Sequence, residues 1–176
     1  MNKDNKQKNI KENILYNNIL LISRNKLFYT HFNLDDTFQN RINLIFIHIS
    51  FLFIKIKQIK ESKVHKLFYQ RLFDYLFRQI DINMREIGYG DVMVNKNMKF
   101  LIKSFYDILL FCENYEKKKA ESKKNFFKKY LLPNINANKV NIIPLNEHFN
   151  KFQSFCFDLE PDSVLKGEIN FNITIV

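Results

Sequence analysis

The sequence predicts an all-α protein with a single helical domain, and three observations favour this fold class. The 176 residues include only three glycines and three prolines, which leaves few tight turns and favours long helices over a β-sandwich or barrel. Hydrophobic residues make up 46% of the chain and charged residues 26%, as in a globular protein. Over several long stretches, apolar residues recur at steps of three and four, the spacing of one helix face. We therefore expect one domain over residues 10–176, built around a central apolar helix and a helical hairpin, after a flexible basic tail over residues 1–9.

The first predicted helix covers residues 10–24, where isoleucine and leucine recur with helical spacing. An aromatic connector follows over residues 27–34. Asp35 and Asp36 then precede Thr37, and carboxylates at this position favour a helix start because they bond free amides and match the positive end of the helix dipole.

The central helix is predicted from about residue 37 to residue 59, and its middle, residues 42–54, is apolar on nearly every face. A membrane span needs roughly 20 apolar residues, and this shorter stretch is interrupted by Asn43, His48 and Ser50. We interpret it as a core helix surrounded by the others; the alternative is a helix lying in a membrane surface. His48 is interpreted as a core histidine, because no second histidine or carboxylate follows it at metal-ligand spacing.

The helical hairpin is predicted over residues 63–116, with its bend at Gly88-Tyr89-Gly90-Asp91. Gly88 is expected to end the first helix in the left-handed conformation, Gly90 to allow a tight turn, and Asp91 to bond turn amides. We call this bend the elbow. The two apolar stripes that should face inward are Leu67, Phe68, Leu72, Tyr75, Leu76, Ile80 and Ile87 before the elbow, and Met98, Leu101, Ile102, Phe105, Ile108, Leu109 and Cys112 after it.

The segment after the hairpin is rich in lysine over residues 116–124, a pattern typical of a solvated helix end or loop. It also holds the candidate contacts with phosphate or the ribosome: Lys117, Lys118, Lys119, Lys123 and Lys124. Beyond it we expect a short helix around Phe126 that stops before Pro133, a helix near residues 146–157, a capped turn over residues 162–169 and an extended segment over residues 170–176.

The formal net charge of +10 and the pI of about 9.5 favour attraction to nucleic acid, ribosomes or anionic membranes. An AT-rich genome, which enriches Lys, Asn, Ile and Phe, explains the same excess without selection for binding. Cys112 and Cys156 show no metal or redox spacing, and Cys112, on an apolar helix face, is predicted to be a structural thiol. The N-terminus resembles neither a signal peptide nor a transit peptide, which favours a cytosolic protein.

Several of these motifs together resemble the ubiquinol–cytochrome c chaperone family, the cytochrome b assembly factors of mitochondria and alpha-proteobacteria. The resemblance covers about residues 14–118, and the order and spacing of its parts make it specific, although the C-terminal third departs strongly. The residues that carry it are Leu72-Phe73-Asp74, Asp81, Met84-Arg85-Glu86-Ile87-Gly88-Tyr89-Gly90-Asp91, Lys96, Met98-Lys99, Phe105-Tyr106 and, upstream, Asp36-Thr37-Phe38 and Arg41.

The resemblance implies a chaperone that is not an enzyme and needs no cofactor or small-molecule substrate. Members bind newly made cytochrome b, their client, and aid assembly of ubiquinol–cytochrome c reductase, respiratory complex III. Mitochondrial members work beside the ribosome with a small helical co-chaperone. The missing transit peptide points to a bacterial member in the cytoplasm, with peripheral contact with the inner membrane as a further expectation; a eukaryotic member would act in the mitochondrial matrix.

The charged and aromatic residues around the elbow are the predicted client-binding surface: Asp81, Arg85, Glu86, Tyr89, Asp91, Lys96, Lys99 and Tyr106. Gly88 and Gly90 are its structural glycines. The alternative is that the charged residues only cap and pin the hairpin. Acid–base catalysis by Glu86 and Asp91 is disfavoured, because no nucleophile, histidine or metal-binding set accompanies them. The competing function is a basic helical module that binds nucleic acid or the ribosome.

Overall fold

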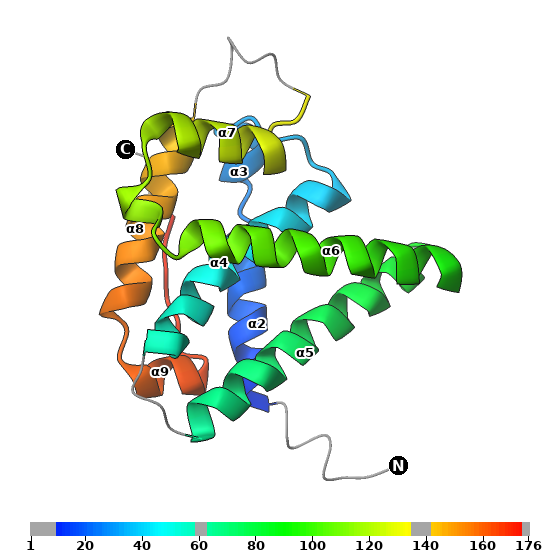
Figure 1. Ribbon diagram of the computed structural model, residues 1–176, viewed down its shortest axis with the longest axis horizontal. Helices are drawn as coiled ribbons and strands as arrows, with labels where there is room; N and C mark the ends of the chain where they lie inside the picture. Colours follow the sequence, from blue (N-terminus) through cyan, green and yellow to red (C-terminus); the bar gives the residue numbers. More distant parts are fainter. Residues whose placement is uncertain (1–9, 59–62, 135–141, 174–176) are drawn as a thin grey trace.

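The computed structural model describes residues 10–58, 63–134 and 142–173. All regular secondary structure within these ranges is helical, which confirms the predicted all-α fold class (Figure 1). The predicted N-terminal tail and residues 174–176 lie outside the described ranges. In chain order the elements are α2 (Ile10–Ser23), α3 (Leu27–Thr30), α4 (Phe38–Gln58), α5 (Lys63–Glu86), α6 (Asp91–Cys112), the 3-10 helix η1 (Tyr115–Lys117), α7 (Ala120–Tyr130), α8 (Ile143–Asp158) and α9 (Pro161–Lys166).

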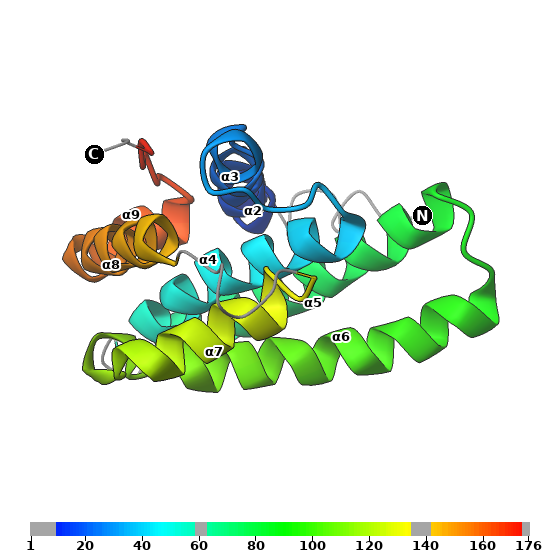
Figure 2. The ribbon, with the colours of Figure 1, turned by 90° about the horizontal axis from the view of Figure 1, so that it is seen from above.

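The apolar helix α4 lies at the centre of the molecule, with α2, α5, α6, α8 and α9 packed around it (Figures 1 and 2). Its residues from Ile42 to Ile54 are all buried, because every side of the helix meets another element. This confirms its interpretation as a core helix. In the described part of the chain, none of the helices combines the length and the hydropathy that a membrane span requires.

The start of α4 is capped by Thr37, whose hydroxyl oxygen accepts a hydrogen bond of 3.1 Å from the backbone amide of Asn40. The prediction that the Asp36 carboxylate bonds the free amides at the start of this helix is wrong. That carboxylate instead accepts two hydrogen bonds, of 2.6 Å and 2.8 Å, from the guanidinium of Arg41. The N-cap residue is therefore Thr37, which directly precedes the helix and bonds the amide three positions later, and not Asp36.

Aromatic packing holds α4, α5 and α6 together around Phe105. Its ring lies 5.3 Å from that of Phe46 and 5.6 Å from those of Phe53 and Phe77, in edge-to-face arrangements. Leu67 and Ile87 were predicted to face inward, but both are exposed. Ile87 follows the last residue of α5, at the bend of the hairpin, where its side chain is exposed.

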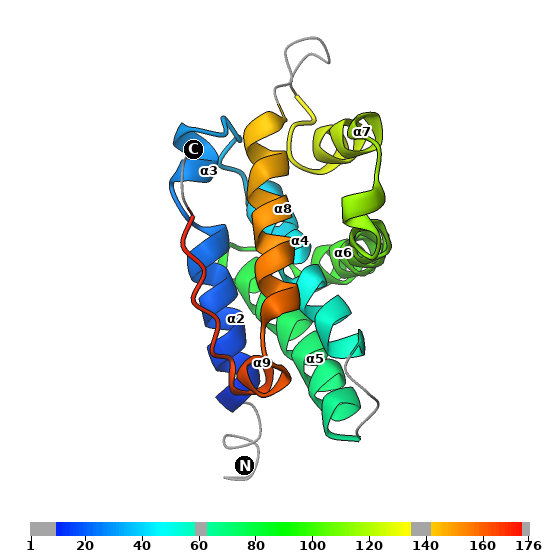
Figure 3. The ribbon, with the colours of Figure 1, turned by 90° about the vertical axis from the view of Figure 1, so that its left-hand side faces the viewer.

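Buried polar side chains join α7 and the C-terminal elements to this core. The amides of Asn40 and Asn43 donate hydrogen bonds of 3.1 Å and 2.6 Å to the carbonyls of Leu131 and Tyr130, at the end of α7. A helix end leaves such carbonyls without an internal partner, so the two asparagines bind α7 to α4. Behind α4, α8 and then α9 lead back to α2, beside which the last described residues lie (Figure 3).

Candidate functional site

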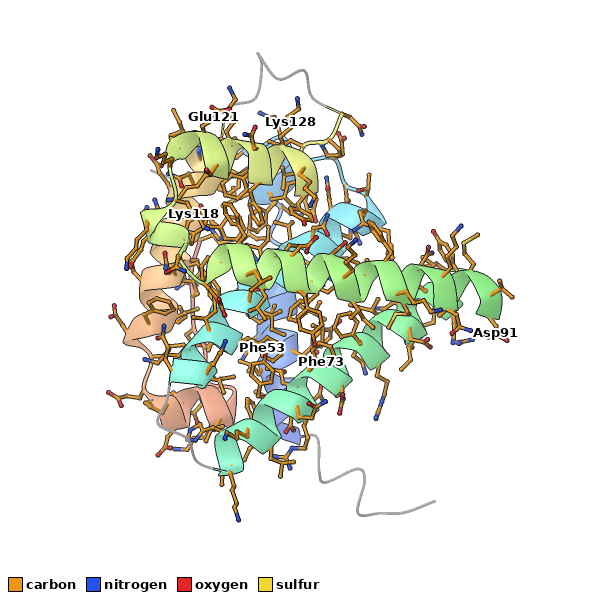
Figure 4. The ribbon with its side chains drawn as sticks, viewed as in Figure 1. Phe53, Phe73, Asp91, Lys118, Glu121 and Lys128 are labelled. Carbon is orange, nitrogen blue, oxygen red and sulfur yellow. The ribbon has the colours of Figure 1, made fainter. Side chains whose placement is uncertain are left out.

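The elbow is a four-residue connection that reverses the chain between α5 and α6 at one end of the molecule (Figures 1 and 4). The amide of Gly88 donates to the carbonyl of Arg85 at 3.0 Å, and the amide of Tyr89 donates to that of Met84 at 3.0 Å. These two bonds form a Schellman motif, which requires a left-handed residue directly after the helix. Gly88 supplies that residue, with φ of 96°.

Gly90 has a different role from Gly88, because its φ of −73° and ψ of 161° are open to any residue. It occupies the N-cap position of α6 without offering a side chain to cap it, and its carbonyl accepts the first helical bond, from Val94, at 2.9 Å. Open space surrounds the position that a Cβ atom would take at Gly90. The geometry at this residue therefore does not require glycine.

These two glycines give a matched pair of substitutions. Gly88→Ala is expected to lower the free energy of unfolding by about 1–2 kcal/mol, because an L-residue is strained in the left-handed conformation. Gly90→Ala should change it by less than about 1 kcal/mol, because alanine restricts the unfolded chain but is less favourable than glycine at the N-cap of a helix. Urea denaturation of both variants beside the unmodified protein measures the difference. Equal effects at the two positions would contradict this account of the turn.

An ion-pair triad spans the elbow and links the two helices. The guanidinium of Arg85 donates a 2.6 Å hydrogen bond to Asp81 on its own helix and a second, charge-assisted bond to Asp91 at the start of α6. Both bonds, first that to Asp81, raise the pKa of Arg85, so its positive charge is permanent. Asp91 is also placed in the first turn of α6, where a carboxylate matches the helix dipole. The triad holds three charges in a fixed arrangement at the molecular surface.

Exposed apolar side chains surround this triad, and the sequence reasoning did not assign most of them to the site. Tyr89, predicted as part of the client-binding surface, is 38% exposed, and Ile87, Val92 and Met93 beside it are 56%, 85% and 48% exposed. Large apolar groups exposed together beside fixed charges are typical of a surface that binds another protein. The signal available in the sequence was their position: a side chain in a tight elbow, or in the helix turn directly beside it, has no opposing helix to cover it.

The other predicted client-binding residues spread out from the elbow. Glu86 is exposed at the end of α5, and Lys96 and Lys99 are exposed in the second and third turns of α6. Tyr106 is farther away, about 22 Å along the helix from Asp91. Its ring lies 5.9 Å from that of Phe73 and is 47% exposed. The structure therefore groups Asp81, Arg85, Glu86, Tyr89 and Asp91 at the elbow and separates Tyr106 from them.

The lysine-rich segment lies at the opposite end of α6 from the elbow (Figure 4). Lys117 and Lys119 are exposed, Lys124 is half-buried, and the ammonium of Lys118 lies 5.3 Å from the ring centroid of Phe111. Lys123 was predicted as a contact with phosphate or the ribosome, but its surroundings do not suit that role. It is buried, its ammonium lies 4.2 Å from the ring centroid of Tyr115 and 3.2 Å from the Asn150 side-chain oxygen, and burial lowers its pKa. Position 123 faces α8 when α7 packs, so Lys123 is unsuited to bind an external phosphate.

A buried histidine pair was not anticipated, since the sequence was searched for a second histidine only at metal-ligand spacing from His48. His48 on α4 and His148 on α8 are both buried, with their Nε2 atoms 2.8 Å apart. Among the described residues, no group of three His, Cys, Asp or Glu side chains is arranged to hold a metal ion. Cys112 and Cys156 are buried as free thiols, and burial raises the pKa of each. The histidine pair therefore lies in the core and not at the elbow.

Comparison with known proteins places the elbow within a recognised family. The family model described as ubiquinol-cytochrome C chaperone matches residues 30–129, which include both hairpin helices and the elbow. The crystal structure of the Cbp3 homolog from Brucella abortus shares the fold, with a TM-score of 0.76 and 21% sequence identity over 96% of this chain and 94% of that one. The comparison with curated proteins found no match. Because the matched residues make up more than half of the chain, this protein belongs to the ubiquinol-cytochrome C chaperone family.

Proposed function

We propose that this chain is an assembly chaperone that binds newly made cytochrome b and aids assembly of ubiquinol–cytochrome c reductase, respiratory complex III. Membership of the family supports a chaperone role. The observation that carries the proposal is the elbow, where the fixed charges of Asp81, Arg85 and Asp91 lie beside exposed Tyr89 and Val92. A partly assembled membrane protein exposes both polar loops and apolar surface, and the elbow offers a counterpart to each.

In this proposal the elbow binds its client and catalyses no reaction. The triad presents a carboxylate, a guanidinium and a second carboxylate in an order that selects for a client loop of complementary charge. The Schellman motif and the ion pairs hold these groups before the client arrives, which limits the ordering needed on binding. No enzymatic activity is proposed. We place the protein in the bacterial cytoplasm, at the surface of the inner membrane where its client is made.

The alternative of a nucleic-acid- or ribosome-binding module has less support. Its candidate lysines are interspersed with Glu116 and Glu121, Lys123 is buried, and Lys118 lies over an aromatic ring. The remaining exposed lysines form too sparse a row to follow a phosphate backbone. Contact with a ribosome or a small helical co-chaperone remains an additional proposal, for which the exposed Lys117 and Lys119 are the candidate residues.

The charge reversal Asp91→Lys is expected to reduce capture of cytochrome b at least tenfold, because a buried or partly buried charge pair at an interface contributes about 2–5 kcal/mol. It should change the free energy of unfolding by only about 1–2 kcal/mol, through an exposed ion pair and the helix dipole. The measurement is the amount of cytochrome b recovered with the tagged protein from membranes in mild detergent, beside a thermal melt.

Asp162→Lys is the matched control, since it makes the same charge change in the first turn of another helix, α9. It should leave capture unchanged. Failure of the unmodified protein to recover cytochrome b, together with normal complex III in a strain lacking the gene, would overturn the proposed function. Equal recovery by Asp91→Lys would show instead that the client binds elsewhere on the chain.

A further inference from the structure

The outer face of α6 is a helix surface that no other described helix covers (Figure 2). In Figure 2, α6 forms one edge of the molecule, with α4 and α5 on one side and no described helix on the other. Phe100 and Leu110 on this face are 60% and 62% exposed. We define the outer face of α6 by the exposed residues that recur along it at steps of three and four: Met93, Lys96, Lys99, Phe100, Lys103, Asp107 and Leu110.

The net charge of this face is positive, with three lysines and one aspartate. Lys96, Lys99 and Lys103 form no ion pair with any residue that the structure describes. The acidic groups of α6 are already engaged: Asp91 binds Arg85 at the elbow, and Asp107 lies 3.8 Å from the ammonium of Lys129 on α7. Three free ammonium groups therefore remain along about 11 Å of helix, and an anionic partner would complement them.

The way in which the apolar residues are arranged favours a lipid surface over a protein. The face lies on a single helix, about 33 Å long, and lysines lie between Met93 and Phe100 and between Phe100 and Leu110. Lysine is depleted in the cores of protein–protein interfaces, where it would be desolvated. At a membrane surface the same alternation is favourable, because lysine reaches the phosphates while phenylalanine, methionine and leucine enter the boundary with the acyl chains.

We infer that the outer face of α6 docks on an anionic lipid bilayer. Lys96, Lys99 and Lys103 would contact the phosphates of the headgroups, and Phe100, with Met93 and Leu110, would enter the interfacial layer. The helix then lies parallel to the membrane, with the elbow at the membrane surface. This inference does not depend on cytochrome b being the client.

The test is cosedimentation of the full chain with vesicles of phosphatidylcholine, with and without about one third phosphatidylglycerol. The unmodified protein should bind the anionic vesicles and not the neutral ones. The triple variant Lys96→Gln, Lys99→Gln, Lys103→Gln should bind about 100-fold more weakly, since each lysine near such a surface contributes several-fold. Phe100→Ser should also weaken binding several-fold while leaving the charge unchanged. Circular dichroism melts verify that each variant is folded.

A control triple variant removes the same charge from exposed lysines outside α6, namely Lys26→Gln, Lys151→Gln and Lys166→Gln. It should keep most of the affinity. Equal losses in the two triple variants would overturn the inference, because they would indicate adsorption through net charge alone. Unchanged binding by Phe100→Ser, or no binding to anionic vesicles, would overturn it as well. Since the vesicles contain no protein, none of these results depends on client capture.

Discussion

Acidification from neutral pH to about pH 4 is expected to lower the free energy of unfolding by at least about 3 kcal/mol through the buried His48–His148 pair. The Nδ1 of His48 lies 2.6 Å from the carbonyl oxygen of Leu44, which can only accept, so Nδ1 carries the proton. Its Nε2 is then an acceptor, and Nε2–H of His148 donates to it across 2.8 Å. Each ring is then neutral, and His48 can gain a proton only at Nε2, which would remove this hydrogen bond.

The surroundings of the pair penalise a positive charge. Phe28 and Phe152 pack against both rings, with centroids between 4.7 Å and 6.3 Å away. Burial lowers the pKa of His48 from 6.5 to about 4, and burial together with the neighbouring His48 and Lys151 lowers that of His148. A proton added to Nε2 of His48 would also place two N–H groups against each other. Protonation is therefore opposed by desolvation and by loss of the hydrogen bond.

The sign of the pH dependence follows from these shifts. An unfolded chain binds a proton at His48 below about pH 6.5, whereas the folded chain does so only below about pH 4. The folded state therefore binds fewer protons between these values, and stability falls as the pH is lowered through this window. Above pH 6.5 the contribution is complete. The gap between the two pKa values of His48 corresponds to about 3 kcal/mol, and His148 acts in the same direction.

Urea denaturation at a series of pH values measures this loss. The double variant His48→Leu, His148→Leu removes both partners with side chains of similar size, so it leaves no unpaired polar atom and should lose about 3 kcal/mol less over the same range. His31→Gln is the control, because His31 is exposed and should make little difference. A pH dependence in the double variant equal to that of the unmodified protein would refute the role of the pair.

The helices and the elbow could be predicted because their signals are local. The pattern of apolar residues marks the helices, and the end of α5 is marked by Gly88, since only glycine adopts the left-handed conformation there without strain. The outward position of Ile87 could have been anticipated only by knowing that α5 ends one residue earlier. A periodic pattern establishes which face of a helix is apolar, but not the residue at which the chain leaves that helix.

Features that join distant segments had no such signal. His48 and His148 are 100 residues apart and meet because α8 packs against α4. Lys123 is one of several lysines in its segment, and only the packing of α7 against α8 decides that this one is buried. In each case the tertiary arrangement selects one residue from several that are equivalent in the sequence, so local reasoning could not identify it.

Gly167→Ala is expected to lower the free energy of unfolding by about 3–4 kcal/mol, which is more than the same substitution at Gly88. Gly167 ends α9 in the left-handed conformation, with φ of 76°, so any L-residue is strained there. A Cβ atom at this position would also lie 2.8 Å from the backbone nitrogen of Leu15 and 2.9 Å from Cγ2 of Ile14, both on α2. The backbone of α2 cannot rotate away as a side chain can, so the two helices must separate.

Comparison of three variants by urea denaturation separates these contributions. Gly88→Ala carries the conformational strain alone, because no atom lies within 4 Å of the Cβ position there. Asn18→Ala removes only the 2.7 Å hydrogen bond that the Asn18 amide donates to the Gly167 carbonyl, and should have an effect of about 1 kcal/mol. Gly167→Ala should exceed both, because it alone forces α9 away from α2. If Gly88→Ala and Gly167→Ala destabilise equally, close contact between these helices contributes little, and the C-terminal elements are held by the packing of α8 on α4 instead.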